Sequence, residues 1–445
     1  IKDEFRLKII ILSKIKFDLS HVGSASKTIN LCGAKPCFLF LTSHTAIPLC
    51  SKSELLWQNR GCIMVGQISN LDARTVLDSR GQPTVEVDCY VDGKLLGRAI
   101  VPSGASTGAY EALELRDGDP SIYLGKGVTK AVQNVTQRIK KAVVGLQVDE
   151  QRTIDETMIE LDGTPNKSNL GANAMLGASM ACLHAGAALN ERPLWKHISG
   201  DNEGLMPVPM LNILNGGAHA TSNVDVQEFM VMPHGFETFQ EGLRAGVETY
   251  HALKAELKKD GLLGGIGDEG GFAPNLPTNE EGLKYMVRAI EGAGYSTEEI
   301  GIALDVASTE FQKEDGYHMG GEVLSSDDLV DLYGGWLDTY PILSIEDGFG
   351  EDDWGGWAAF TKKYGHRVQS VGDDLFVTQS KRLSQGIELG AANAMLVKLN
   401  QVGTVTETLA SMELATSNGM NNVVSHRSGE SLSLIHISEP TRPID

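Results

Sequence analysis

Hydrophobic and polar residues alternate in one part of this chain and follow a different rhythm further on. Between Val85 and Val91, apolar residues at every second position alternate with more polar ones, which is typical of a half-buried strand. Asp92-Gly93 then favours a tight turn into a second strand over residues 94–101. Helical stretches follow, including residues 170–189, where many Ala and Gly residues suit close helix packing. This pattern predicts an α+β unit.

From Met206 onward, short apolar runs end in a polar or charged residue and are followed by helical stretches, the rhythm of a parallel βα barrel. A linking helix is expected from Phe239 to Leu257, because its apolar residues fall on one face and Gly261 suits a C-terminal cap. The predicted barrel strands are residues 207–214, 228–232, 302–305, 343–346, 368–373, 394–398 and 422–426.

The last five predicted strands end in a chemically active side chain: Asp305, Glu346, Asp373, Lys398 and His426. In a parallel barrel, the C-terminal ends of the strands meet on the face that carries the chemistry. One charge at the end of one strand ordinarily marks only where the chain meets water. Five such ends in succession favour a shared pocket.

Asp305, Glu346 and Asp373 are hard oxygen ligands of the kind that Mg²⁺ prefers. The alternative is that they are solvated strand ends. Lys398 beside such a site would be both desolvated and close to cations, and both effects favour a neutral amine that can act as a base. A structural ion pair between Lys398 and one of the acids is the alternative.

Composition excludes several classes of protein. With 445 residues, 41% of them hydrophobic, and 50 glycines, the chain can fold as two or more units. A net charge of -20 argues against nucleic-acid binding, which needs clustered Lys and Arg. No apolar run is long enough for a membrane span.

Residues 1–63 differ from the rest, with an excess of basic residues and four of the six cysteines in no zinc or disulfide spacing. Three origins fit this segment: a targeting presequence, a genuine extension, or translated upstream sequence before a start at Met64, which we favour. The remaining cysteines, Cys89 and Cys182, suit a reducing, cytoplasmic compartment.

Eight motifs occur in order along the chain: Asp78-Ser-Arg-Gly81, Pro102-Ser-Gly-Ala-Ser-Thr-Gly108, Leu211-Asn-Ile-Leu-Asn-Gly-Gly-Ala-His219, Gln227-Glu-Phe229, Gly267-Asp-Glu-Gly-Gly271, Ser344-Ile-Glu-Asp347, Lys398-Leu-Asn-Gln401 and Ser425-His-Arg-Ser-Gly-Glu430. Together they resemble the enolase family from about Ile68 to Glu430. The resemblance implies an α/β protein with an N-terminal α+β domain at 64–204 and a TIM-like (β/α)8 barrel domain at 205–430.

The resemblance also implies an activity, the magnesium-dependent dehydration of 2-phosphoglycerate to phosphoenolpyruvate in glycolysis and its reversal in gluconeogenesis. Such an enzyme is a carbon–oxygen lyase, phosphopyruvate hydratase, and acts as a cytoplasmic homodimer with two Mg²⁺ ions per active site. Within the same superfamily, a racemase or acid dehydratase is the closest alternative, but the motifs at 103–108 and 425–428 favour a phosphorylated substrate. An inert structural or surface-binding protein is the alternative from another class.

The resemblance assigns roles to individual residues. Asp305, Glu346 and Asp373 hold the first Mg²⁺, and Ser106 helps to bind a second. Lys398 removes the proton next to the carboxylate, and two cations stabilise the enediolate that results. The resemblance also implies that Glu269 protonates the departing hydroxyl with help from Glu228. The residues that line the pocket are His219, Gln227, His426, Arg427 and Ser428. Of these, Arg427 and Ser428 bind the phosphate.

Three of these assignments have simpler explanations without the resemblance. Ser106 lies in a small-residue segment that an ordinary turn would explain. His219 comes soon after two consecutive glycines, so it could be an ordinary histidine in a loop. Arg427 could be an ordinary charged residue on the surface.

The C-terminal end departs from the family pattern. Enolases carry a second active-site lysine on an eighth strand, but no lysine follows Lys398 in this chain. Residues 431–445 look like translated sequence from another source rather than enolase sequence. We therefore expect an incomplete barrel whose first and seventh strands expose unpaired edges, a template for aggregation. The chain as written is expected to be poorly soluble or inactive.

Overall fold

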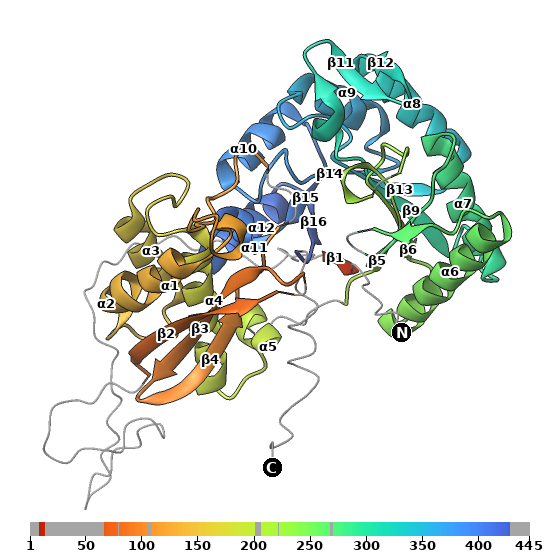
Figure 1. The fold of residues 1–445 in the computed structure, drawn as a ribbon. Helices are drawn as coiled ribbons and strands as arrows, with labels where there is room; N and C mark the ends of the chain where they lie inside the picture. The colour runs from red at the N-terminus through yellow and green to blue at the C-terminus, as the bar shows by residue number, and fades with distance from the viewer. Residues whose placement is uncertain are drawn as a thin grey trace, which may run out of the picture. The chain divides into compact units, whose positions relative to one another are not determined.

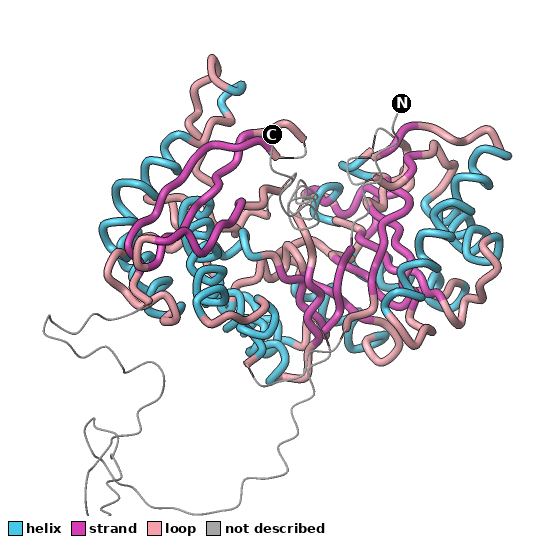
Figure 2. The backbone as a smooth tube through the Cα atoms, turned by 90° about the horizontal axis from the view of Figure 1, so that it is seen from below, coloured by secondary structure: helices cyan, strands magenta, loops and turns pink. Residues whose placement is uncertain are grey.

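The computed structural model describes residues 9–13, 66–78, 80–104, 108–200, 206–220, 222–267 and 270–427. All of these residues belong to one compact unit. Their strands form three sheets: a three-stranded sheet in the N-terminal part, a 10-stranded sheet in the C-terminal part, and a small three-stranded sheet beside the latter. Figures 1 and 2 show helices alongside both of the main sheets.

The N-terminal sheet contains β2 (Ile68–Leu77), β3 (Pro83–Val91) and β4 (Lys94–Ile100) in sequence order. The predicted hairpin is present, because β3 pairs antiparallel with β4 up to the pair Val91↔Lys94. Asp92 and Gly93 between them both have positive φ angles, 50° and 79°. A two-residue type I′ turn requires that conformation at both central positions, which explains why Asp-Gly occurs here.

Helices α1 (Thr129–Gln133), η2 (Asn134–Ile139), α2 (Lys140–Val143) and α4 (Ala172–Leu189) contact this sheet, and Figure 1 shows α4 alongside it. The other helices of the N-terminal part are η1 (Tyr123–Gly125), α3 (Gln151–Asp162) and α5 (Leu194–Ser199). Among the described residues, α4 is the one helix long and apolar enough to cross a membrane, but 78% of it is buried inside the structure. That burial is typical of a core helix.

Small residues let α4 lie directly on the sheet. A Cβ atom on Gly97 of β4 would come within 2.0 Å of the carbonyl oxygen of Ala181 in α4. On the same interface, the sulfur atoms of Cys89 and Cys182 are 3.8 Å apart, and both thiols are free and buried. The Ala- and Gly-rich composition of this helix is therefore explained by close backbone contact.

The larger sheet has the strand order β1–β16–β15–β14–β13–β9–β6–β5–β8–β7, and β1 also pairs with β5. All seven predicted barrel strands are present within one or two residues of the expected bounds. The strands are β1 (Ile9–Ser13), β5 (Pro209–Asn215), β6 (Glu228–Pro233), β7 (Gly265–Ile266), β8 (Phe272–Ala273), β9 (Ile300–Asp305), β13 (Ile342–Glu346), β14 (Gln369–Gly372), β15 (Ala394–Val397) and β16 (Asn421–Val424). The small sheet contains β10 (Gln312–Lys313), β11 (Gly316–Met319) and β12 (Glu322–Leu324).

The expectation of a wholly parallel barrel is wrong at one strand. β6 runs antiparallel to both of its neighbours, β5 and β9. The physical reason lies in the connection from Asn215 to Glu228, where the short 3-10 helix η3 (Gly217–His219) is the one helix among the residues that the structure describes. A parallel neighbour needs a crossover that carries the chain back across the sheet, usually a helix, whereas a short link reverses the strand.

The expected free edges of β5 and β16 are also not found. β1 pairs antiparallel with β16 through Ile11↔Val424 and with β5 through Ile10↔Met210. Three of its five residues are Ile, a β-branched residue that favours strands. The strand satisfies backbone groups on both edges, which removes the exposed pairing surface that the seven predicted strands alone would leave.

The C-terminal helices pack against the outer face of the sheet (Figure 1). The helix predicted over 239–257 is α6 (Phe239–Lys259), and Gly261 beyond it has the left-handed φ of 72° that favours glycine after a helix. The remaining helices are α7 (Asn279–Gly292), η4 (Ser308–Phe311), α8 (Ser326–Thr339), α9 (Trp354–Tyr364), α10 (Ser380–Leu389), α11 (Leu399–Val402) and α12 (Val405–Ser417).

Two apolar clusters lie on opposite faces of the larger sheet. The outer cluster joins strand residues such as Leu211 and Ile302 to the helices. The inner cluster is small and contains Met210, Met230, Ala303, Val371, Ala394, Leu396 and Val423. This cluster covers the inner face of the sheet. The inward residues that lie between it and the rim of the strand ends are polar.

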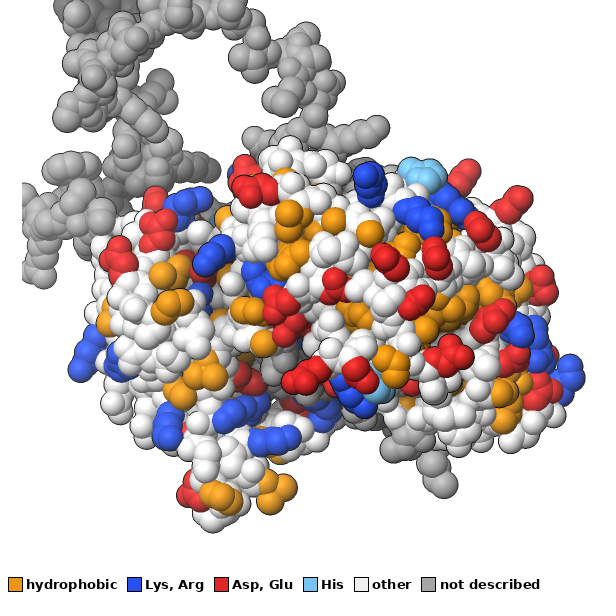
Figure 3. Space-filling model, turned by 90° about the horizontal axis from the view of Figure 1, so that it is seen from above, with side chains coloured by type: hydrophobic (Ala, Val, Ile, Leu, Met, Phe, Trp, Pro, Cys, Tyr) orange, Lys and Arg blue, Asp and Glu red, His pale blue; other side chains and the backbone are white. Residues whose placement is uncertain are grey.

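On the face shown in Figure 3, acidic and basic side chains are interspersed, with no broad field of Lys and Arg.

Candidate active site

Three carboxylates lie side by side at one end of the larger sheet. Glu228 of β6 pairs with Asp305 of β9, and Asp305 pairs with Glu346 of β13. Paired residues on neighbouring strands project from the same face, and Met230 and Ala303, two positions along, belong to the inner cluster. The three side chains therefore point inward, and they are 0%, 5% and 2% exposed, respectively.

Asp373 and Lys398 follow the next two strands, β14 and β15. The ammonium of Lys398 donates a hydrogen bond to one carboxylate oxygen of Asp373, and both residues are buried. Burial alone would raise the pKa of Asp373, but the positive charges of Lys398 and Arg427 hold that pKa below its ordinary value of 3.8. Asp373 is therefore a carboxylate at neutral pH.

His219 and Gln227 contact this row of acids from the connection between β5 and β6. Nδ1 of His219 lies 3.3 Å from a carboxylate oxygen of Glu228. The side-chain amide of Gln227 donates a hydrogen bond of 3.0 Å to Asp305. The short link that reverses β6 thus brings both polar side chains to the rim where the carboxylates lie.

His426 and Arg427 follow β16 on the same rim. Arg427 is 6% exposed, and its guanidinium lies 3.7 Å from the carboxylate of Glu111 in the N-terminal part of the chain. His426 is half-buried. Because the charge of Arg427 lowers the pKa of Asp373, this cation acts on the same site as Lys398.

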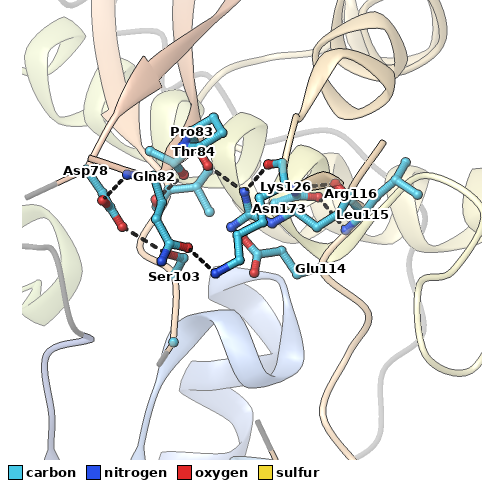
Figure 4. Close-up of polar contacts among 12 residues, drawn as sticks. Asp78, Gln82, Pro83, Thr84, Ser103, Glu114, Leu115, Arg116, Lys126 and Asn173 are labelled. Atoms are coloured by element: carbon cyan, nitrogen blue, oxygen red, sulfur yellow. Dashed lines mark hydrogen bonds and ion pairs between the residues drawn. The ribbon is translucent and has the colours of Figure 1, made fainter. Parts of the chain in front are cut away.

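Hydrogen bonds hold the backbone on both sides of the segment that contains Glu111. Asp78 accepts a hydrogen bond of 3.3 Å from the hydroxyl of Ser103, as Figure 4 shows. Arg116 donates to the carbonyl oxygens of Pro83 and Lys126, at 2.5 Å and 2.7 Å. The Asp-Ser-Arg-Gly motif at 78–81 and the small-residue segment after Pro102 are thereby tied together.

Gln401 and Glu111 belong to this site, although the sequence did not single them out. The buried amide of Gln401 donates a hydrogen bond of 2.7 Å to the second oxygen of Asp373 and one of 3.3 Å to Glu111. Gln401 ends the motif Lys398-Leu-Asn-Gln401, so its position in that motif was the available signal.

A second group of carboxylates overlaps the predicted set. Among the described residues, ligand oxygens of Asp347, Asp373 and Asp374 lie within 4.8 Å of one another. Asp347 accepts hydrogen bonds of 2.9 Å from the backbone N–H groups of Asp373 and Asp374, so it holds the turn after β14. Burial, together with the charge of Asp373, raises the pKa of Asp374 to about 8, and burial also raises the pKa of Asp347.

Three predicted site residues lie outside the described residues. They are Ser106, Glu269 and Ser428. The structure brings together the other nine: His219, Gln227, Glu228, Asp305, Glu346, Asp373, Lys398, His426 and Arg427 lie at one rim of the sheet.

This rim has the chemistry of a divalent-cation site. Its inward carboxylates are buried at paired positions of neighbouring strands, and the ligand oxygens of Asp347, Asp373 and Asp374 lie within 4.8 Å of one another. Buried ionised groups of like charge are destabilised unless opposite charge is near. Hard oxygen donors from several strands suit Mg²⁺ or Ca²⁺. Lys398, which donates a hydrogen bond to one of these carboxylates, is a candidate base. The planar guanidinium of Arg427 can bind an anionic group through two hydrogen bonds.

The fold and the site together define a barrel enzyme with an N-terminal α+β domain and a carboxylate-lined centre. Comparison with known families gives two matches, the enolase N-terminal domain over residues 68–198 and the enolase C-terminal TIM barrel domain over residues 203–438. The enolases of Bifidobacterium animalis subsp. lactis (strain AD011) and Bifidobacterium adolescentis are each 56% identical over 366 residues, which is 82% of this chain and 85% of the relative.

The chain belongs to the enolase family. Membership makes it a metal-dependent carbon–oxygen lyase of the glycolytic pathway, a phosphopyruvate hydratase. The family expectation from the eight motifs is thus confirmed.

Proposed function

We propose that this chain removes water from 2-phosphoglycerate with Mg²⁺, and that Asp305, Glu346 and Asp373 are the protein ligands of one Mg²⁺. The proposal replaces the expectation of an inactive chain, because β1 pairs with both strands whose edges were expected to be exposed. The observation that carries this proposal is the row of inward carboxylates on β6, β9 and β13 next to the Asp373–Lys398 ion pair. When bound, Mg²⁺ supplies positive charge next to the substrate carboxylate, where negative charge develops.

Lys398 is proposed as the base that removes the proton from the carbon next to the carboxylate. Its buried position and its hydrogen bond to Asp373 fix the amine at the strand ends. A positioned base of this kind contributes typically about 10²–10⁴-fold to a rate. Glu269 is proposed to protonate the departing hydroxyl, and Glu228 to assist it.

The remaining proposed roles concern binding. His219, Gln227 and His426 line the pocket, Arg427 and Ser428 hold the phosphate, and Ser106 helps to bind a second Mg²⁺. The charge of Arg427 acts on Asp373, which supports a phosphate subsite within electrostatic reach of the proposed metal subsite.

We also propose that the chain works as a homodimer in the cytoplasm, with no nucleic-acid or membrane partner. The free, buried thiols of Cys89 and Cys182 support a reducing compartment. Light scattering on the purified protein tests the dimer, because a mass corresponding to one chain would contradict it.

A direct assay tests the proposed reaction. The ultraviolet absorbance of the enol product is followed after 2-phosphoglycerate is added with Mg²⁺, and then with excess chelator. We expect absorbance to rise only with Mg²⁺. No rise with folded protein would overturn the proposal, and so would an equal rise in Lys398→Met.

A further inference from the structure

A chain of hydrogen bonds runs from the N-terminal part of the molecule into the barrel site. One carboxylate oxygen of Glu111 accepts from the side-chain amide of Gln401 at 3.3 Å. The same amide donates to one oxygen of Asp373 at 2.7 Å, and Lys398 donates to the other. Each oxygen of Asp373 thus has its own donor.

The orientation of Gln401 is fixed within this chain. Its carbonyl oxygen accepts a hydrogen bond of 2.7 Å from the hydroxyl of Thr378, and that hydroxyl accepts one of 2.9 Å from the backbone N–H of Lys398. Gln401 is 0% exposed. Rotating its amide by half a turn would point its NH₂ group away from both carboxylates, which would leave buried acceptors without their donor.

Glu111 is held in place from several sides. Its first oxygen also accepts from the backbone N–H of Gly108 at 3.1 Å, and its second lies 3.7 Å from Arg427. The backbone N–H of Ala112 donates to the backbone carbonyl oxygen of Gln401 at 2.8 Å, which ties the two chain segments together. The side chain of Glu111 is 6% exposed.

We propose that Glu111 is a positioning residue for the metal site and acts through Gln401, whose amide it holds against Asp373. The inference rests on the proposed function, in which Asp373 is a ligand of Mg²⁺. Hydrogen-bond partners of metal ligands set the ligand's orientation, and their removal typically weakens metal binding or activity about 10–100-fold. The affinity of the barrel site for Mg²⁺ therefore depends on a side chain of the N-terminal part.

Two variants of Glu111 isolate the hydrogen bond from the charge. Glu111→Gln and Glu111→Met remove the same negative charge beside Arg427 and have a similar size, but only Gln keeps an oxygen that accepts from Gln401. Titration calorimetry of each full-length protein with MgCl₂, without substrate, measures the dissociation constant. We expect it to rise about tenfold in Glu111→Met and to stay within about twofold of the parent in Glu111→Gln.

The same link is tested from its other end. Gln401→Met fills the same space without a donor, so the dissociation constant for Mg²⁺ is expected to rise about tenfold or more. Thermal denaturation of each variant shows whether it is folded. If Glu111→Met does not fold, Gln401→Met and Glu111→Gln still decide the matter.

The inference would be overturned if folded Glu111→Met or folded Gln401→Met bound Mg²⁺ with a dissociation constant within twofold of the parent. Equal weakening of Mg²⁺ binding in Glu111→Gln and Glu111→Met would also overturn it, because the lost charge would then explain the effect. The proposed function fails separately, through absence of 2-phosphoglycerate turnover in the parent protein. Mg²⁺ titration does not depend on that turnover, so the two failures are distinguishable.

Discussion

The ammonium of Lys398 donates a hydrogen bond to the carboxylate of Asp373, and this ion pair joins the ends of two neighbouring strands, β14 and β15. It also joins two proposed functions, because Lys398 is the proposed base and Asp373 a proposed Mg²⁺ ligand. The pKa of Asp373 is lowered by the charge of Lys398, despite the opposing effect of burial. Changes at either residue are therefore expected to affect both functions.

Replacing Lys398 with Met should remove most of the activity. The variant keeps the length of the side chain but has no amine, so the rate of 2-phosphoglycerate dehydration is expected to fall about 10²–10⁴-fold. Lys363→Met is the matched control, since Lys363 is exposed and pairs with Asp331 on the surface. Steady-state assays with Mg²⁺ check this expectation, and Lys398→Met with a tenth or more of the parent activity would contradict it.

Local pattern was sufficient to predict the strands but not how all of them pair. The alternation at 85–91 and the Asp92-Gly93 turn predicted the hairpin, because a two-residue turn needs positive φ angles that only a few residue types adopt readily. The direction of β6 depends on the segment that links it to β5. The sequence prediction treated each apolar run as a strand followed by a long helix, whereas the described residues of this link contain the short helix η3. The pairing of β1 with β5 and β16 joins residues far apart in the sequence, which no local pattern indicates.

The predicted site shows the same limit. Asp305 and Glu346 end their strands and Lys398 directly follows β15, so their shared rim follows from strand direction alone. Glu111 and Gln401 meet across a large sequence separation, and neither ends a strand. Their contribution depends on how the two parts of the chain pack, and only the structure shows that packing.

Asp374 should make the stability of the metal-free protein depend on pH. Its folded pKa of about 8 lies above the ordinary value of 3.8, so the folded state retains a proton that the unfolded state loses as pH rises between these values. The contribution of Asp374 to stability is therefore full below about pH 4 and is lost as pH rises toward 8. Asp374→Asn has no such proton to lose.

Thermal denaturation in the presence of a chelator checks this expectation. The melting temperature of Asp374→Asn relative to the parent should increase from pH 5 to pH 8 and then level off above the folded pKa. A difference that stays constant over this range would show that Asp374 is ionised in the folded protein at every pH tested.

Gly97→Ala should destabilise the N-terminal part strongly. The added Cβ would lie 2.0 Å from the carbonyl oxygen of Ala181 and 2.6 Å from the backbone nitrogen of Ala185, so the sheet and α4 must separate. Overpacking typically costs about 1–3 kcal/mol, and backbone neighbours cannot move as side chains do. Gly335→Ala is the control, because nothing lies near its added Cβ and alanine favours a helix over glycine. Urea denaturation of both variants should give opposite signs.

Asp155 links the N-terminal part to the barrel, and its replacement should weaken that link. One oxygen of this fully buried carboxylate accepts from the backbone N–H and the hydroxyl of Thr406, at 2.9 Å and 2.6 Å, in the first turn of α12. The other accepts from the amide of Gln151 at 3.1 Å. Negative charge at a helix N-terminus is favourable, and Asp155 supplies it from outside the helix.

Asp155→Asn keeps the shape but replaces one acceptor with a donor, so either Thr406 or Gln151 must face an NH₂ group. We expect the free energy of unfolding to fall by about 1–3 kcal/mol, the cost of leaving a buried polar group without a partner. Asp331→Asn, at an exposed ion pair on α8, should change it by less than about 1 kcal/mol. Because α12 follows α11, which contains Gln401 and begins directly after Lys398, hydrogen exchange of the backbone at 398–406 should also rise in Asp155→Asn. Unchanged exchange there, in a variant of lowered stability, would mean that Asp155 stabilises its own helix α3 rather than the junction with α12.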